Sequence, residues 1–123
     1  MEVLIDSNIV IYSLQFNQNN LRIWFGKHFP VISSITQLEV LGYKGITEKE
    51  IDFVQRYFSL CEIIPIDQIV IWNAIELRQD NQMSVGDAII AATAKVKNLP
   101  LATANIKDFK HIEGLELINP LEL

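Results

Sequence analysis

Five short apolar segments alternate along this chain with longer segments of helical periodicity, and this alternation most restricts the possible folds. The strand-like segments are residues 2–6, 30–34, 61–66, 100–104 and 115–121. The helical segments are residues 7–14, 21–29, 34–42, 46–60, 67–82 and 84–98. Parallel strands need crossover connections that hold a helix, and such sheets bury both faces under helices. The order predicts an α/β protein with a central, largely parallel sheet and helices on both faces.

Capping residues mark the predicted ends of these helices. Ser, Thr, Asp and Asn side chains accept hydrogen bonds from the free N–H groups of a first turn, whereas Gly and Pro end helices. The predicted starts are Ser7 or Asn8, Ser34, Thr47, Asp67 and Ser84, and the predicted stops are Pro30, Gly42 and Asn98 with Pro100. Residues 105–114, NIKDFKHIEG, are predicted to form a polar connection.

The length of the chain, 123 residues, predicts one domain spanning residues 1–123, large enough to bury a core without disulfides. Although 50% of the residues are hydrophobic, no apolar run approaches the length of a membrane-spanning helix. The first residues, MEVLIDSN, carry acids where a signal peptide carries basic residues. We therefore expect a soluble, cytoplasmic protein with no membrane partner.

The formal net charge of −5 argues against broad electrostatic attraction to nucleic acid, which depends on an excess of Lys and Arg facing phosphates. It does not exclude an enzyme that gathers carboxylates around divalent cations, because those carboxylates contribute to the total.

Cys61 is the only cysteine, so an intramolecular disulfide is excluded. Its apolar neighbours predict a small core residue at the edge of a strand.

Residues 84–94, SVGDAIIAATA, have the small apolar side chains of a buried helix, with the carboxylate of Asp87 among them. An ionised group is costly there unless it is paired, hydrogen-bonded or bound to a metal ion. Taken alone, the stretch is explained by a capping box, in which the Ser84 hydroxyl accepts a backbone N–H and the Asp87 carboxylate reaches back to the cap. A metal-binding role for Asp87 depends on which other residues lie near it.

Polar residues follow several of the predicted strands or begin the helices beside them. In a parallel sheet, functional groups collect beyond the carboxyl ends of the strands, where the strand order reverses. The residues expected at this edge are Asp6, Glu39, Asp87, Thr103, Asn105 and Asp108.

Three or four carboxylates at one edge repel one another and have raised pKa values unless a cation neutralises them. Mg²⁺ or Mn²⁺ is the predicted cation, because hard divalent ions prefer oxygen ligands and leave room for phosphate oxygens and an attacking water. The hydroxyl groups placed to assist are those of Ser7, Ser33, Thr36 and Thr103. The chain has no glycine-rich phosphate loop, G-x-S-x-G elbow or Cys/His zinc spacing, and His28 and His111 are interpreted as surface residues.

Four stretches together resemble, in order and spacing, the PIN-domain ribonucleases of the VapC toxin type. They are VLIDSNIVIY with Asp6, SSITQLEVL with Glu39, SVGDAIIAATA with Asp87, and LATANIKDF with Asn105 and Asp108. The resemblance runs from end to end of the chain. It implies a three-layer α/β/α PIN-like domain with a central, mainly parallel sheet, an acidic cluster that binds Mg²⁺ or Mn²⁺, and cleavage of RNA. It also implies a cognate antitoxin as partner and a homodimer.

By this resemblance, Asp6, Glu39 and Asp87 are metal ligands and catalytic residues. The fourth position is open between two candidate catalytic residues. Asp108 is our choice as the fourth metal ligand, whereas Asn105 can offer a neutral carbonyl but no charge. The implied supporting residues are Thr36 and Thr103, with their hydroxyls, and Ser7 and Asn8, which position the loop that bears Asp6.

The leading prediction is a metal-dependent endoribonuclease that acts as the toxin of a type II toxin–antitoxin pair. The alternative is a PIN-like RNA-binding or protein-interaction module with weakened or lost catalysis, which the neutral Asn105 keeps open. A third possibility is a metal-dependent nuclease of DNA, or of both nucleic acids, outside any toxin system. Aromatic residues at helical spacing are predicted to belong to the core or to an interface that an antitoxin covers: Trp24, Phe25, Phe29, Tyr57 and Phe58.

Overall fold

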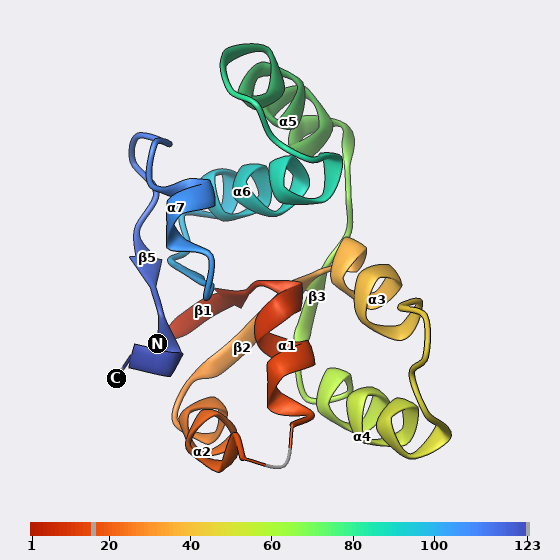
Figure 1. Cartoon of the computed structure of the whole chain (residues 1–123). Coiled ribbons are helices and arrows are strands. Elements are labelled where there is room, and N and C mark those ends of the chain that lie inside the picture. The colour runs from red at the N-terminus through yellow and green to blue at the C-terminus, as the bar shows by residue number, and fades with distance from the viewer. Residues whose placement is uncertain (16, 123) are drawn as a thin grey trace.

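A single parallel sheet organises the computed structural model, which describes residues 1–15 and 17–122. The strands are β1 (Glu2–Ile5), β2 (Phe29–Ser33), β3 (Glu62–Ile64), β4 (Leu101–Ala102) and β5 (Leu117–Ile118). Their order is β3-β2-β1-β4-β5, and every neighbouring pair is parallel. The chain first adds strands on one side of β1 and then crosses to the other side, so the strand order reverses between β1 and β4 (Figure 1). The predicted parallel α/β sheet is confirmed.

Helices cover both faces of this sheet (Figure 1). They are α1 (Ser7–Ser13), α2 (Asn19–Gly26), α3 (Ser34–Leu41), α4 (Glu48–Phe58), α5 (Gln68–Asp80), α6 (Val85–Lys97) and α7 (Ile106–Phe109), followed by a 3₁₀ turn at Pro120–Glu122. The first four helices pack on one face, α6 and α7 pack on the other, and α5 lies outside α6, which gives the predicted three layers. Within the described residues, no helix is long and apolar enough to cross a membrane.

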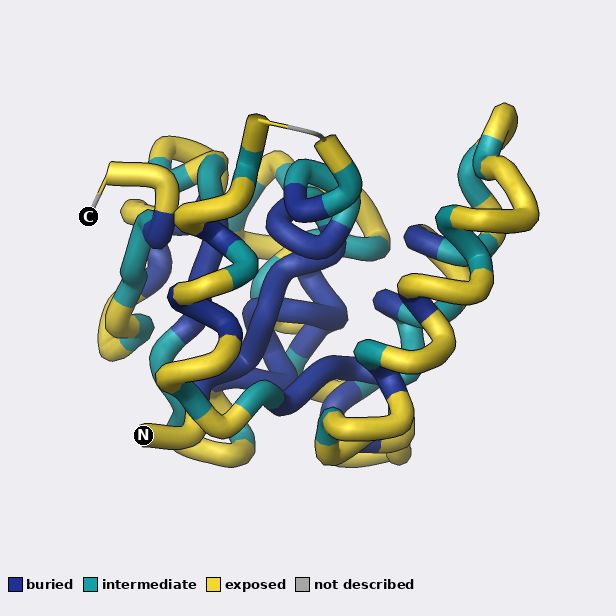
Figure 2. Tube along the Cα trace, turned by 90° about the horizontal axis from the view of Figure 1, so that it is seen from below, coloured by how far each residue is buried: buried dark blue, intermediate teal, exposed yellow. Residues whose placement is uncertain are grey.

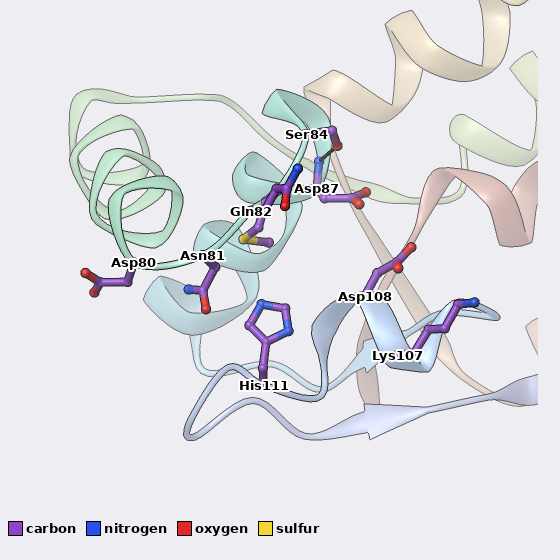
Figure 3. A pocket seen from close by; sticks show the side chains of 9 residues that line it. Asp80, Asn81, Gln82, Ser84, Asp87, Lys107, Asp108 and His111 are labelled. Atoms are coloured by element: carbon purple, nitrogen blue, oxygen red, sulfur yellow. Dashed lines mark hydrogen bonds between the residues drawn. The ribbon is translucent and has the colours of Figure 1, made fainter.

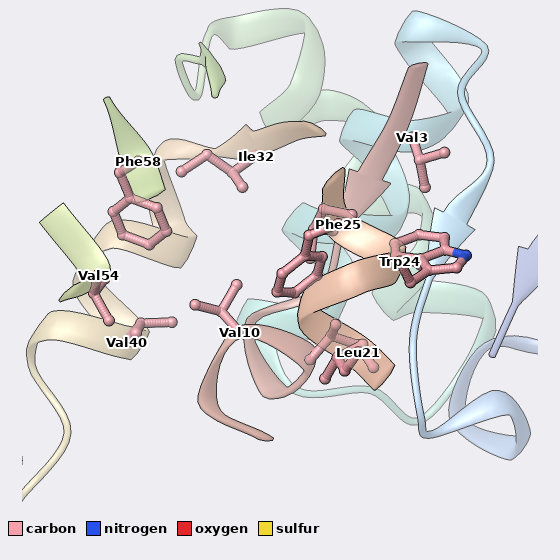
Figure 4. Packing of buried hydrophobic residues seen from close by; sticks show 12 residues of the cluster. Val3, Val10, Leu21, Trp24, Phe25, Ile32, Val40, Val54 and Phe58 are labelled. Atoms are coloured by element: carbon pink, nitrogen blue, oxygen red, sulfur yellow. The ribbon is translucent and has the colours of Figure 1, made fainter. Parts of the chain in front are cut away.

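The side chains of β1 alternate between two hydrophobic clusters, because successive strand residues point to opposite faces. Val3 and Ile5 join the cluster beneath α1–α4, which Figure 4 shows from close by. Leu4 joins the cluster beneath α6 and α7. All three side chains are at most 1% exposed, and Figure 2 shows the buried part of the trace running through the interior. The core therefore holds both helical layers against β1.

Helix α6 is buried on two sides, which explains its small side chains. Ala91 and Ala94 pack towards the sheet, whereas Ala88 and Ala92 pack towards α5. Small residues allow a helix to approach neighbours on both sides without clashes. The predicted buried helix at residues 84–98 is thus confirmed, with its C-terminal cap at Asn98 in the left-handed conformation (φ 54°).

Several predicted caps are present. At the start of α4, Thr47 Oγ1 accepts from the Glu50 N–H at 3.1 Å and Glu50 Oε1 accepts from the Thr47 N–H at 3.0 Å, which makes a complete capping box. At the start of α5, Asp67 Oδ1 accepts from the Val70 N–H at 2.9 Å. These local signals were sufficient because each cap involves residues only three positions apart.

Two predicted helix starts were displaced by one residue. The cap position of α1 is Asp6, not Ser7 or Asn8, and the Asp6 side chain makes no capping hydrogen bond. The cap of α3 is Ser33, whose Oγ accepts from the Ile35 N–H at 3.2 Å, and Ser34 is already helical. In both cases the strand runs almost directly into the helix, which leaves no loop residue for the predicted cap.

Two other predictions were wrong. Helix α2 ends at Gly26, and Pro30 lies inside β2 instead of stopping the helix. Pro30 pairs with Val3 of β1, whereas the pairing of β2 with β3 begins only at Val31, so the missing N–H of the proline disrupts no ladder there. Residues 105–114 also contain a helical turn, α7, because buried Phe109 anchors it in the core.

Candidate metal centre

The switch point between β1 and β4 brings Asp6 and Thr103 together. Asp6 follows β1 and Thr103 follows β4, and both are buried, with exposed fractions of 4% and 0%. The Asp6 N–H donates to the Ala102 carbonyl at 2.9 Å, which continues the strand pairing past the end of β1. The Thr103 hydroxyl donates to Asp6 Oδ2 at 2.7 Å. The pairing of the strands therefore fixes the orientation of this carboxylate.

A second network of hydroxyls orients Glu39. Ser7 Oγ donates to Glu39 Oε1 at 2.7 Å and lies 3.0 Å from Thr36 Oγ1. Because a hydroxyl has one proton, Thr36 donates to Ser7 when Ser7 donates to the carboxylate. Thr36 and Glu39 share one face of α3 because they are three residues apart. The start of α1 thus holds the side chain of a residue on α3.

Gly86 has no Cβ atom, and the Glu39 carboxylate occupies the space where one would lie. A Cβ atom at Gly86, in the first turn of α6, would lie 2.5 Å from Glu39 Oε2, closer than van der Waals contact allows. The same turn carries Asp87, whose N–H donates to Ser84 Oγ at 3.1 Å. The predicted capping role of Ser84 is confirmed, and the cap places Asp87 beside Glu39.

The carboxylates at this edge affect one another's protonation. The pKa of Asp6 is raised from its ordinary value of 3.8 to about 6, chiefly by burial and also by the charges of Asp87 and Glu39, while the Thr103 hydrogen bond opposes the increase. Burial also raises the pKa of half-buried Asp87, and Asp108 and Glu39 add to the increase. In the described part of the chain none of these acids forms an ion pair. Within the described residues, the cluster therefore carries negative charge that no ion pair neutralises.

The two candidates for the fourth position differ in their surroundings. Asp108, on α7, is exposed and close enough to Asp87 to raise its pKa. Asn105 is also exposed, and its N–H donates to Thr103 Oγ1 at 3.0 Å. Asn8 is half-buried, and no hydrogen-bond partner for its Oδ1 is found among the described residues. Of the two candidates, only Asp108 adds charge to the cluster.

The donor set consists of carboxylate, hydroxyl and amide oxygens, which suits Mg²⁺ or Mn²⁺. As the side chains stand, no three His, Cys, Asp or Glu residues in ranges 1–15 and 17–122 are arranged around one ion position. Magnesium sites commonly use one or two direct carboxylates and several waters, so they need no closer convergence. Mutual repulsion also keeps unneutralised carboxylates apart. The residues therefore fit a divalent cation held by one or two carboxylates and water.

A polar cavity of about 610 Å³ adjoins this cluster (Figure 3). Asp87 and Asp108 form part of its wall, together with the connection between α5 and α6 and with Lys107 and His111. Sequence analysis interpreted His111 only as a surface residue. It is exposed, but it also lines the cavity, three positions after Asp108. This three-residue spacing is the signal in the sequence, and it has meaning only because residues 106–109 form a helical turn, which the pattern of residues 105–114 does not predict.

An all-parallel α/β/α fold with acids at the switch point of its sheet defines the class of protein, and similarity to known proteins identifies the family. The family model described as PIN domain matches residues 3–115. Ribonuclease VapC10 of Mycobacterium tuberculosis is 30% identical over 123 residues, covering 93% of this chain and 90% of that protein. Ribonuclease VapC1 of Rickettsia felis is 29% identical over 129 residues, covering 96% of each.

Solved structures agree with the sequence comparison. A chain of a toxin–antitoxin complex from Klebsiella pneumoniae superposes with a TM-score of 0.79 at 32% identity, covering 96% of this chain and 97% of that one. The chain described here belongs to the PIN-domain family. The predicted resemblance is therefore confirmed for the family and for the fold.

We predict that Gly86→Ala strengthens the fold but weakens metal binding. Alanine is favoured over glycine in a helix by up to about 1 kcal/mol. The added Cβ displaces the flexible Glu39 carboxylate from its Ser7 hydrogen bond, so Mn²⁺ affinity should fall about tenfold, as for other losses of ligand orientation. Denaturant unfolding and calorimetric Mn²⁺ titration measure the two effects.

Gly26→Ala is the control, since its Cβ would meet nothing within 4 Å. Unchanged Mn²⁺ affinity in Gly86→Ala would contradict the prediction.

We predict that Asp6 makes the metal-free protein less stable as the pH rises. Between the ordinary pKa of 3.8 and the folded value of about 6, the folded chain keeps a proton that the unfolded chain loses. The free energy of unfolding therefore falls by up to about 3 kcal/mol as the pH rises through this window. The full contribution of Asp6 to stability is present only below the ordinary pKa of 3.8. Asp6→Asn should remove most of this slope while keeping an acceptor for Thr103, and the raised pKa of Asp87 leaves a smaller slope.

Denaturant unfolding in EDTA, from acidic to mildly alkaline pH, checks this expectation. The variant should gain stability relative to the wild type as the pH rises, and added Mg²⁺ should stabilise the wild type alone. Parallel pH profiles for the two proteins would show that Asp6 is not titrating as described.

Proposed function

We propose that this chain is a metal-dependent endoribonuclease that hydrolyses RNA phosphodiester bonds as the toxin of a toxin–antitoxin pair. The observation that carries the proposal is the group of mutually interacting carboxylates of Asp6, Glu39 and Asp87 at the switch point, beside Asp108 and without a paired cation in the described residues. Membership of the PIN-domain family and similarity to proteins named ribonucleases support RNA as the substrate. The proposal includes a single domain over residues 1–123, since all strands share one sheet.

The proposed metal ligands are Asp6, Glu39, Asp87 and Asp108. A bound Mg²⁺ or Mn²⁺ supplies a water of lowered pKa and neutralises charge on the phosphoryl oxygens. Thr103 keeps the Asp6 carboxylate in place, and Ser7 with Thr36 keeps Glu39 in place, so these ligands need little reorganisation. Asn105 can offer its amide oxygen to the same edge but adds no charge.

An antitoxin is the proposed protein partner. The solved relative from Klebsiella pneumoniae is a toxin–antitoxin complex. In this chain, a largely apolar cavity of about 410 Å³ lies between α2 and α4, with Phe25, Phe53 and Tyr57 in its lining. Phe53 at 40% exposure and Leu60 at 74% extend this apolar surface. An amphipathic segment of a small partner protein suits such a groove.

The proposed homodimer has a candidate interface on α5. Ile69, Trp72 and Ile75 on this helix are exposed by 56%, 61% and 48%. Helix α5 lies outermost and packs chiefly against α6 (Figure 1). Contiguous exposed apolar patches of this kind mark protein–protein contacts more often than free surface. A second copy of the chain would cover the patch.

We expect the purified, antitoxin-free protein to cut mixed structured RNA with Mg²⁺ or Mn²⁺ and not with EDTA. Asp87→Asn should lower the rate by about 100-fold or more, because it removes a carboxylate proposed to hold the metal ion that would stabilise charge on the reacting phosphate. Asp52→Asn is the matched control, since Asp52 is an exposed residue of α4 paired with Arg56 at 3.0 Å. A small protein encoded beside this chain should inhibit the same reaction.

The absence of cutting by the folded wild-type protein, over varied RNAs and both metals, would overturn the nuclease assignment. It would favour the RNA-binding or protein-interaction module that Asn105 leaves open.

We expect the chain alone to be a dimer by light scattering and Trp72→Asp to be a monomer with unchanged circular dichroism. A charge buried at the centre of an apolar interface is costly, whereas the same residue on a free surface is tolerated. Phe53→Asp, on the other exposed apolar surface, is the control and should remain dimeric. A monomeric wild-type protein, or a dimeric Trp72→Asp variant, would contradict the proposed interface.

A further inference from the structure

The polar cavity beside Asp87 and Asp108 is large enough to hold a nucleotide. Its volume of about 610 Å³ lies within the range of about 300–1,000 Å³ that is usual for pockets of small ligands. Figure 3 shows Asp87 and Asp108 on its wall, with His111 and Asn81 lining it further along. The cavity therefore adjoins the place where a phosphate would meet the carboxylate cluster.

The wall formed by the connection between α5 and α6 is held by local hydrogen bonds. Asn81 Nδ2 donates to the Leu77 carbonyl at 3.0 Å. Arg78 Nε donates to the Met83 carbonyl at 3.2 Å. These bonds tie the connection to the last turns of α5, so its side chains are presented in a defined arrangement rather than on a free loop.

The opposite wall is anchored in the core. Phe109 and Ile112 are buried, with exposed fractions of 0% and 5%, and they pack in the cluster beneath α6. Lys107 and His111, which line the cavity, alternate with these anchors along α7 and the turn after it. Burial of the anchors therefore holds in place the backbone that carries Lys107 and His111.

Three polar side chains in the cavity have no partner within the described residues. Gln82, Lys107 and His111 line it and make no side-chain hydrogen bond or ion pair there. Each offers a different contact: an ammonium group suits a phosphate, an amide matches the edge of a base, and an imidazole ring stacks on a base. The wall of the cavity also includes Met83, whose thioether adds an apolar surface for a ring.

We propose that this cavity binds the nucleotide next to the scissile phosphate of single-stranded RNA and sets the base preference of cleavage. Lys107 contacts the backbone phosphate, Gln82 reads the base edge, and His111 stacks on the base. This subsite rests on the proposed ribonuclease function. An unstacked base suits it, because sequence-specific RNA recognition depends on bases that are free to leave the helical stack. With a net charge of −5, the protein also needs a local cation of this kind to hold a polyanion.

Binding without catalysis is the first test. The full chain is titrated in EDTA with short single-stranded RNA of random sequence, at several salt concentrations. Lys107→Gln should weaken binding and lower the slope of log K against log salt by about 0.7, the value for one phosphate contact in a single strand. Lys27→Gln is the matched control. Lys27 is exposed and precedes β2, so it lies at the amino-terminal end of the strands, whereas the carboxylates lie at their carboxyl ends. An unchanged salt slope in Lys107→Gln would overturn the phosphate contact.

The base preference is the second test. Sequencing of the RNA ends that the wild-type enzyme produces should show a preference at one position next to the cut. Gln82→Ala and His111→Ala should flatten that preference, and His111→Ala should weaken RNA binding about tenfold, as stacking losses do. Circular dichroism confirms that each variant is folded. An unaltered cleavage profile and unaltered RNA affinity in both variants would overturn the proposal.

The two proposals fail in different ways. A wild-type protein that binds RNA in EDTA through this cavity but never cuts it would contradict the nuclease and support the subsite. A protein that cuts RNA with the same affinity and profile in all three variants would support the nuclease and contradict the subsite.

Discussion

The pairing of β1 with β4 at the switch point is the constraint on which the site depends. It brings Asp6 and Thr103, which are 97 positions apart in the chain, to a distance of 2.7 Å between the hydroxyl and the carboxylate oxygen. Burial of a carboxylate is costly, and here it is the main reason that the pKa of Asp6 is raised to about 6. The Thr103 hydroxyl offsets part of this cost, and a divalent cation would offset the remainder. The fold thus holds a carboxylate in a place that favours a bound metal ion.

The two helical layers contribute to the site in different ways. On one face, α1 and α3 meet so that Ser7 reaches Glu39. On the other face, α6 approaches the sheet closely, because its inner residues are small, and its first turn brings Asp87 and the bare Cα of Gly86 to the same place. The alanine-rich packing of α6 and the acidic site therefore depend on each other. The small side chains allow the approach, and the approach places the carboxylates together.

Local patterns predicted most of the secondary structure. The caps at Thr47, Asp67 and Ser84 involve contacts between residues three positions apart, so the sequence pattern was sufficient for them. Pro30 was misjudged because its tolerance inside β2 depends on where β3 begins to pair. Helix α7 was missed because a turn of four residues has little periodicity of its own and is stabilised by the burial of Phe109.

By itself, the sequence determined the alternation of strands and helices, the parallel class of the sheet, the family motifs and the acids that they carry. Only the tertiary structure decided that Asp6 is buried, that Gly86 makes room for Glu39, and that the α5–α6 connection and α7 enclose a cavity beside Asp87. The physical reason is the separation along the chain between the residues that interact. Capping and periodicity act between neighbours in the chain, whereas burial, charge coupling and cavity shape depend on segments that the fold alone brings together.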